Sequence, residues 1–155
     1  MMEHLVYCDN AGKSGERVLD KIRKGTKTMV VRSAAGRKIP QSRVFAGEVL
    51  YFMEKGTTSI GMRAVVTAVQ NFVKLSEDEI DRVFADNGEK LNLAGKQRER
   101  WHKKCICLVE FGAVEEIAPL EFEHQGNMDD WLILEKIADV LVGTSVPYNY
   151  DKARF

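Results

Sequence analysis

The stretch from residue 47 to residue 69, GEVLYFMEKGTTSIGMRAVVTAV, consists of two strongly apolar arms around a short polar segment, EKGTTS. Two β-rich runs joined by a short turn that contains a glycine are typical of an antiparallel β-hairpin. Because both arms are apolar at most positions, we expect each arm to be buried on at least part of both faces. This hairpin predicts a fold built on a mainly antiparallel sheet.

The segment before the hairpin, KGTKTMVVRS at residues 24–33, places cationic side chains around a short apolar run. The β-branched residues of this run predict a strand. A helix is expected before the strand, from the N-cap Ser14 to about Lys24, with Gly25 as its stop. The stretch AAGRKIPQSR follows the strand and contains a glycine and a proline, so we expect an exposed basic loop there.

Three further segments have helical patterns. The clearest is LSEDEIDRVFADNG at residues 75–88, where Ser76 and Glu79 form a capping box and an Asn-Gly pair forms the stop. The stretch LAGKQRERWHK at residues 93–103 predicts a short helix. A last helix is expected over residues 129–142, because apolar side chains recur there at helical spacing.

Two apolar runs outside the hairpin predict additional strands, LVYC at residues 5–8 and CICLVEFG at residues 105–112. Together with the helices they indicate a single α+β domain over residues 1–155, built on a mainly antiparallel sheet. Residues 144–155 show no periodicity and are expected to form a loose tail.

The composition excludes several classes of protein. Of 155 residues, 45% are hydrophobic, which is enough for a folded core and too many for a disordered chain. No apolar stretch approaches the roughly 20 residues that span a membrane, and the first ten residues do not resemble a signal peptide. Three cysteines, an odd number, fit a reducing cytoplasm better than a disulfide framework.

The charges are segregated although the formal net charge is zero. Residues 12–43 contain ten Lys or Arg and two acids, a net charge of +8, and residues 96–104 contain five cations and one acid, a net charge of +4. Residues 110–139 contain nine acids and one lysine, a net charge of −8. If the two basic segments meet, they form a patch that attracts phosphate; alternatively, the basic and acidic segments pair with each other.

The order of these elements resembles the ASCH domain and its relatives in the PUA-like superfamily. The family has a short helix ending in Gly, a Lys two residues later, a strand ending in Arg, and a Gly-acid pair that opens the next strand. The matching positions are Gly25, Lys27, Arg32, Gly47 and Glu48. The resemblance covers residues 15–112, and it includes the hairpin and a helical insertion before a late strand.

The resemblance implies a small, largely antiparallel β-barrel with helices packed against its openings, and the binding of RNA or of modified nucleotides. Some ASCH relatives hydrolyse acylated nucleosides or RNA. The family often has a Glu or Thr three residues after the Lys, and Val30 occupies this position. Valine cannot transfer a proton or hold an amide, which argues against hydrolysis. An apolar residue here looks closer to uncharacterised archaeal relatives of the superfamily.

Lys27 and Arg32 are the strongest candidates for a binding site. Lysine offers a compact charge for a phosphate, or a base if its pKa is lowered, and arginine offers a planar fork for a phosphate or a base edge. Five positions separate the two residues, so a regular strand would point them to opposite faces. They share a site only if Lys27 belongs to the turn or if the strand is bulged.

The full set of residues expected to bind RNA or a nucleotide comes from this segment, the basic loop and the second basic cluster: Lys27, Thr28, Arg32, Arg37, Lys38, Arg43, Arg100 and Lys103. Trp101 in the second cluster either stacks on bases or anchors the cluster to the core, and we favour the anchor. Cys105, Cys107 and His102 are a weak zinc signal, so no metal and no cofactor is predicted.

Three functions remain open from the sequence. The first is binding of RNA or a modified nucleotide through a basic cleft. The second is a small amidohydrolase acting on a modified nucleoside, with Lys27 as its base. The third is a protein-interaction module. Steep weakening of binding by salt would distinguish the first from the third.

Overall fold

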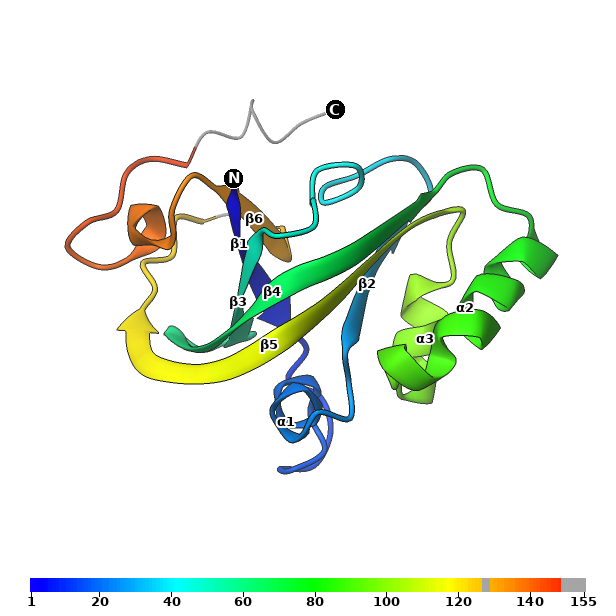
Figure 1. The fold of residues 1–155 in the computed structure, drawn as a ribbon, viewed down its shortest axis with the longest axis horizontal. Helices are drawn as coiled ribbons and strands as arrows, with labels where there is room; N and C mark the ends of the chain where they lie inside the picture. The colour runs from blue at the N-terminus through cyan, green and yellow to red at the C-terminus, as the bar shows by residue number, and fades with distance from the viewer. Residues whose placement is uncertain (127–128, 149–155) are drawn as a thin grey trace.

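The computed structural model describes residues 1–126 and 129–148 and contains one curled sheet with helices around it (Figure 1). The elements in chain order are β1 (Glu3–Cys8), α1 (Val18–Lys24), β2 (Met29–Ala34), β3 (Val49–Glu54), β4 (Ser59–Phe72), α2 (Glu77–Leu91), α3 (Gly95–Trp101), β5 (Cys105–Glu121), β6 (Trp131–Leu134) and the 3₁₀ helix η1 (Ile137–Val140). None of the helices among the described residues is long and apolar enough to cross a membrane.

The six strands form one sheet in the order β2-β5-β4-β3-β1-β6. The predicted hairpin is confirmed as the antiparallel pair β3 and β4, and only β1 and β3 pair in parallel among the described strands. The register between β4 and β5 shifts at three places along their length. Such irregularities bend and twist paired strands, and these two long strands curl across the molecule in Figure 1.

The prediction of a β-barrel is correct only in part, because the sheet curls without closing. Its edges are β2 and β6, and no backbone pairing joins them within the described ranges. Side chains fill the opening instead: the Arg32 guanidinium on β2 lies 5.7 Å from the Trp131 ring on β6. The fold is therefore a half-barrel whose open seam is occupied by a cation and an indole ring.

Alternation along the strands divides the core between the two faces of the sheet. The concave face gathers residues from all six strands, and the Phe52 and Phe111 rings, from β3 and β5, lie 5.2 Å apart across the curl. On the convex face, Met29 and Val31 of β2 pack under α2. The expected two-sided burial holds for β3, whereas β4 has exposed residues at alternate positions.

The helix predicted over residues 129–142 is wrong. Residues 131–134 form β6, which pairs with β1 in the register Val6↔Trp131, and η1 follows. Trp131 and Leu132 are both buried, on opposite faces of the strand, so the apolar run fits a two-sided strand as well as a helix. The exposed edge of β1 decides between the two by offering backbone hydrogen bonds.

Residues 144–148 of the expected tail are among the described residues. The Ile133 amide donates to the Tyr148 hydroxyl at 3.1 Å, and the Tyr148 amide donates to the Gln125 side chain at 2.8 Å. Residues 144–148 are thus tied to the rest of the chain. The remainder of the predicted tail, residues 149–155, lies outside the described residues.

Of the two serines predicted as N-caps, Ser76 caps its helix and Ser14 does not. Ser76 accepts a hydrogen bond from the Glu79 amide at 3.2 Å, and the Glu79 side chain accepts from the Ser76 amide at 3.0 Å, as predicted. The helix runs three residues past the predicted stop to Leu91, and its C-cap Asn92 lies in the left-handed region at φ 47°. In α1, the N-cap is Arg17 rather than the predicted Ser14, because Asp20 takes the capping hydrogen bonds from the Gly15 and Arg17 amides.

Ser76→Ala is expected to lower the free energy of unfolding by about 1 kcal/mol, because it leaves the Glu79 amide without its capping partner. Ser14→Ala, a matched change at the serine that does not cap, is expected to have no measurable effect. Urea unfolding followed by circular dichroism measures both. Equal losses in the two variants would contradict the assignment of the cap.

Candidate functional site

A cleft lies in the seam of the half-barrel, between β1, β2 and α3. Its volume is about 30 Å³, enough for water or for a small polar substituent but not for a nucleobase. Its lining residues come from strands β1 and β2, from α1 and α3, and from nearby turns: Val6, Tyr7, Cys8, Asp9, Val18, Lys27, Val30, Val31, Arg32, Lys55, Leu93, Gln97, Arg100, Trp101 and Asp130.

Lys27 is buried at the inner end of this cleft, with only 3% of its surface exposed. Its ammonium donates a hydrogen bond to the backbone carbonyl of Leu91, the last residue of α2. Burial, and to a smaller extent the nearby charge of Arg32, lowers the pKa of Lys27 to about 7. Lys27 therefore changes charge close to neutral pH, which few lysines do.

Arg32 lies in the middle of the seam and is held on several sides. One terminal nitrogen donates to the Tyr7 carbonyl at 2.6 Å and the other to the Val31 carbonyl at 2.8 Å. The guanidinium lies within cation–π distance of two indole rings, 5.2 Å from Trp101 and 5.7 Å from Trp131. Its Nε is buried without a hydrogen-bond partner, the only such side-chain atom among the described residues.

Lys27 and Arg32 share the cleft because Lys27 is not part of the strand. β2 begins at Met29, so Lys27 belongs to the turn after α1. The rule that successive side chains of a strand point to opposite faces of the sheet therefore does not apply to Lys27. Arg32 and Val30 point to the concave side, and Met29 and Val31 belong to the convex core. The geometric conflict noted from the sequence is thus removed by the turn, and no bulge in β2 is needed.

Polar contacts at the rim connect α3 to the opposite wall of the cleft. Arg100 donates to Asp130 at 2.8 Å, Lys55 lies 3.6 Å from the same carboxylate, and Gln97 donates to Asp9 at 3.2 Å. Burial raises the pKa of Asp9, but hydrogen bonds from the backbone amide of residue 11 and from Gln97 outweigh it and lower that pKa overall. The rim therefore carries hydrogen-bond acceptors, the carboxylates of Asp9 and Asp130, while the interior carries hydrogen-bond donors.

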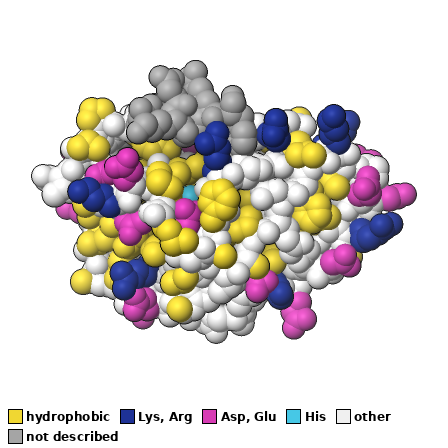
Figure 2. Space-filling model, turned by 45° about the horizontal axis from the view of Figure 1, so that its top comes forward, with side chains coloured by type: hydrophobic (Ala, Val, Ile, Leu, Met, Phe, Trp, Pro, Cys, Tyr) yellow, Lys and Arg dark blue, Asp and Glu magenta, His cyan; other side chains and the backbone are white. Residues whose placement is uncertain are grey.

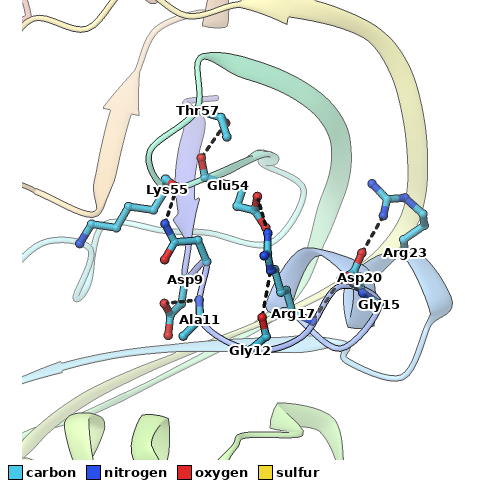
Figure 3. A network of polar contacts seen from close by, with 11 residues as sticks. Asp9, Ala11, Gly12, Gly15, Arg17, Asp20, Arg23, Glu54, Lys55 and Thr57 are labelled. Atoms are coloured by element: carbon cyan, nitrogen blue, oxygen red, sulfur yellow. Dashed lines mark hydrogen bonds and ion pairs between the residues drawn. The ribbon is translucent and has the colours of Figure 1, made fainter.

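The loop between β1 and α1 holds this rim in place (Figure 3). Arg17 donates to the Gly12 carbonyl at 3.2 Å and reaches Glu54 at the end of β3 at 3.4 Å. The Asn10 side chain donates to the carbonyl of Lys55, in the turn between β3 and β4. These contacts tie the loop that carries Asp9 to the turn that carries Lys55.

The structure brings together some of the predicted binding residues and separates others. Lys27, Arg32 and Arg100 line the cleft, and Trp101 both packs on Arg32 and forms part of the wall. The others are not among its lining residues: Thr28, Arg37, Lys38, Arg43 and Lys103. Arg37, Lys38 and Lys103 are exposed, whereas Thr28 and Arg43 are half-buried.

The two charge arrangements that the sequence left open both occur. The basic segments meet, since the Ser33 hydroxyl donates to the Trp101 carbonyl at 2.6 Å next to Arg32. Basic and acidic segments also pair, as in Arg23 with Glu116 at 2.6 Å. On the face in Figure 2, cationic and anionic side chains are intermixed, with hydrophobic side chains between them. That face therefore carries charges of both signs together rather than a separate cationic patch.

Sequence reasoning missed the β1 and β6 contributions to the site. Asp130 and Trp131 were assigned to a helix, and the Tyr7 carbonyl is a backbone group that no motif reveals. His4 is completely buried in β1 against Trp131 and Glu48. A polar residue inside the apolar run of residues 3–8 was the one available signal.

The cysteines are buried free thiols. Burial raises the pKa of Cys8, which lines the cleft, and of Cys107 to about 12, so both are protonated at neutral pH and neither is a ready nucleophile. Among the described residues, no group of three or more His, Cys, Asp or Glu side chains is placed to hold a metal ion.

Solved structures share this arrangement of strands and helices. ASCH from Zymomonas mobilis superposes with a TM-score of 0.54 and 14% identity, over 77% of this chain and 73% of that chain. This chain has an ASCH-like fold. Two point variants of the Zymomonas protein give TM-scores of 0.55 at the same identity, over 77% of this chain and 73% and 75% of theirs.

The likeness to ASCH structures confirms the predicted fold family at the level of fold. No protein-family model matches the sequence, and no curated protein is similar to it. At 14% identity the likeness concerns the arrangement of the backbone and carries no residue roles with it.

Proposed function

We propose that this ASCH-like chain binds RNA or a modified nucleotide through the seam cleft. The observation that carries the proposal is the buried, unpaired Nε of Arg32, which lies in a cleft that also holds Lys27. A buried donor without a partner costs on the order of 1–3 kcal/mol, and a ligand oxygen or ring nitrogen that accepts from it would recover that cost. The proposal includes a cytoplasmic location, in keeping with the free thiols.

The chemistry of the cleft suggests how such a ligand is held. Lys27 and Arg32 present hydrogen-bond donors to the interior, and the rim carboxylates Asp9 and Asp130 present acceptors. A polar substituent of a nucleotide fits the enclosed space, and its base would lie at the rim beside Trp101 and Arg100. Indole and guanidinium faces are the side-chain surfaces on which bases stack.

A longer RNA would extend beyond the cleft to the remaining predicted residues. Arg37, Lys38, Arg43 and Lys103 have the positive charge to contact its phosphates, and they stay part of the proposal on that ground. If about three phosphates are contacted, the logarithm of the binding constant falls with the logarithm of salt concentration with a slope of about −2.

The test is a ¹⁵N NMR titration with a short single-stranded RNA of mixed sequence at two salt concentrations. We expect shifts at the Arg32 Nε–H and at amides of β2 and α3, with binding that weakens steeply as salt rises. Shifts confined to other parts of the chain, or binding that salt does not weaken, would remove the proposal and favour a protein-interaction module.

A second candidate function, hydrolysis of a modified nucleoside, is favoured by the lowered pKa of Lys27. A lysine with a pKa of about 7 is partly neutral at physiological pH and can accept a proton. Val30 lines the cleft and offers no hydroxyl or carboxylate to assist proton transfer, which argues against hydrolysis. This apolar residue is also the reason for proposing that the chain is nearer to archaeal relatives of the PUA-like superfamily. Turnover of an acylated nucleoside that survives Lys27→Met would exclude Lys27 as the base.

A further inference from the structure

His4 is the centre of a buried chain of hydrogen bonds that ends at the cleft. Its ring is fully buried, with Nε2 2.9 Å from a Glu48 oxygen and Nδ1 3.0 Å from the indole nitrogen of Trp131. An indole N–H can only donate, so Nδ1 of His4 must be the acceptor. The proton of the neutral imidazole therefore sits on Nε2 and is donated to Glu48.

Glu48 is fixed in turn by backbone amides. Its carboxylate accepts hydrogen bonds from the amides of Met2 and Phe45, both at 2.8 Å. Burial raises the pKa of Glu48, but the hydrogen bonds from His4 and from these amides outweigh it and hold that pKa below its usual value. Glu48 is thus an ionised acceptor that selects one tautomer and one orientation of His4.

Trp131 connects this chain to the candidate site. Its ring is 2% exposed and meets His4 edge-on, with 5.7 Å between the ring centroids. The same indole lies 5.7 Å from the Arg32 guanidinium, on the opposite edge of the open sheet. No backbone hydrogen bond joins β2 to β6 across this part of the described structure, so the Trp131 ring is one of the few contacts that fix Arg32 across the seam.

We propose that Glu48, His4 and Trp131 form a positioning chain that holds the Arg32 guanidinium in its binding orientation. None of the three is among the residues that line the cleft, and each acts through the next. A role in binding rests on the proposed function. The chain of contacts itself can be tested without any ligand. In this chain, Glu48, the acidic residue of the Gly47-Glu48 pair, has a structural role: it orients His4.

His4→Gln tests the chain at its centre. The glutamine amide can still donate toward Glu48, but it places no acceptor at the position of Nδ1, so the Trp131 N–H loses its partner. The matched control is Leu132→Val, a change at the neighbouring residue of β6, which is equally buried but faces the other core. Trp131→Phe is a second route, because it keeps an aromatic ring and removes the N–H.

The first readout is NMR of the protein without ligand. We expect the Arg32 Nε–H signal and the Trp131 indole signal to shift in His4→Gln, the Arg32 signal to shift in Trp131→Phe, and both signals to stay in place in Leu132→Val. An Arg32 signal that is unchanged in both His4→Gln and Trp131→Phe would overturn the proposal, whatever the protein binds.

The second readout is affinity for the same short single-stranded RNA. We expect His4→Gln to weaken binding on the order of tenfold, the size of effect that supporting hydrogen bonds have at metal sites. Leu132→Val should bind like the unchanged protein. Unchanged RNA affinity in His4→Gln, with the protein folded, would overturn a positioning role. If the unchanged protein binds no RNA, the proposed function fails while the NMR result still decides the positioning chain.

Discussion

Lys27→Met is expected to stabilise the protein most at pH 6 and progressively less as the pH rises. In the folded protein the pKa of Lys27 is lowered from 10.5 to about 7, mainly by burial. Between these two values the unfolded chain binds a proton that the folded chain does not, so the stability of the unchanged protein rises with pH, by about 1.4 kcal/mol per pH unit. Below pH 7 both states are protonated, and the full cost of burying the charge, roughly 5 kcal/mol, is present.

Methionine has a similar length and does not titrate, so it removes this cost at every pH. Urea unfolding of both proteins at pH 6, 7, 8 and 9 gives the difference in unfolding free energy, which should shrink by roughly 3 kcal/mol between pH 7 and pH 9. Titration of other groups cancels in this difference. Lys13→Met removes an exposed lysine and serves as the control. A difference that stays constant from pH 6 to pH 9 would show that Lys27 is not perturbed.

Replacing Arg32 by lysine is expected to abolish most RNA binding although the charge is kept. Lysine has a single nitrogen, which cannot occupy both the position of the Arg32 nitrogen that donates to the Tyr7 carbonyl and the position of Nε, from which the ligand would accept. Loss of a buried, charged hydrogen bond costs about 3 kcal/mol, roughly a hundredfold in affinity. Arg32→Gln, which also removes the charge, should bind no better.

Isothermal titration calorimetry with the short single-stranded RNA measures these affinities. Arg63→Gln is the matched control, since Arg63 is an exposed arginine on β4 that pairs with Glu115 and is not among the residues that line the cleft. Circular dichroism melts must show that each variant is folded at the temperature of the titration. Binding by Arg32→Lys at the affinity of the unchanged protein would exclude Arg32 as the recognition residue.

Local signals were sufficient for several elements. The hairpin β3–β4 follows from two apolar arms around a glycine-containing turn, and the start of α2 follows from the Ser76–Glu79 capping box. In these cases the partners are close in sequence, so the stabilising contacts can be inferred from short patterns. The pairing of Lys27 with Arg32 in one site was anticipated on the condition that Lys27 lies in the turn, and β2 does begin at Met29.

Other features depend on partners that are distant in the chain. Residues 131–134 were predicted as part of a helix, although their apolar pattern suits a helix or a strand. They form a strand because they pair with the backbone at the edge of β1. The sequence by itself determined the antiparallel hairpin, the capped helix and the cationic segment around β2. Only the tertiary structure decided that Lys27 is buried against the end of α2, that Arg32 meets Trp101 and Trp131 in an open seam, and that His4 supports Trp131. The physical reason is that burial sets the charge of a side chain such as Lys27, and contacts between strands that are distant in sequence set its orientation. Local sequence patterns reveal neither the burial nor these contacts.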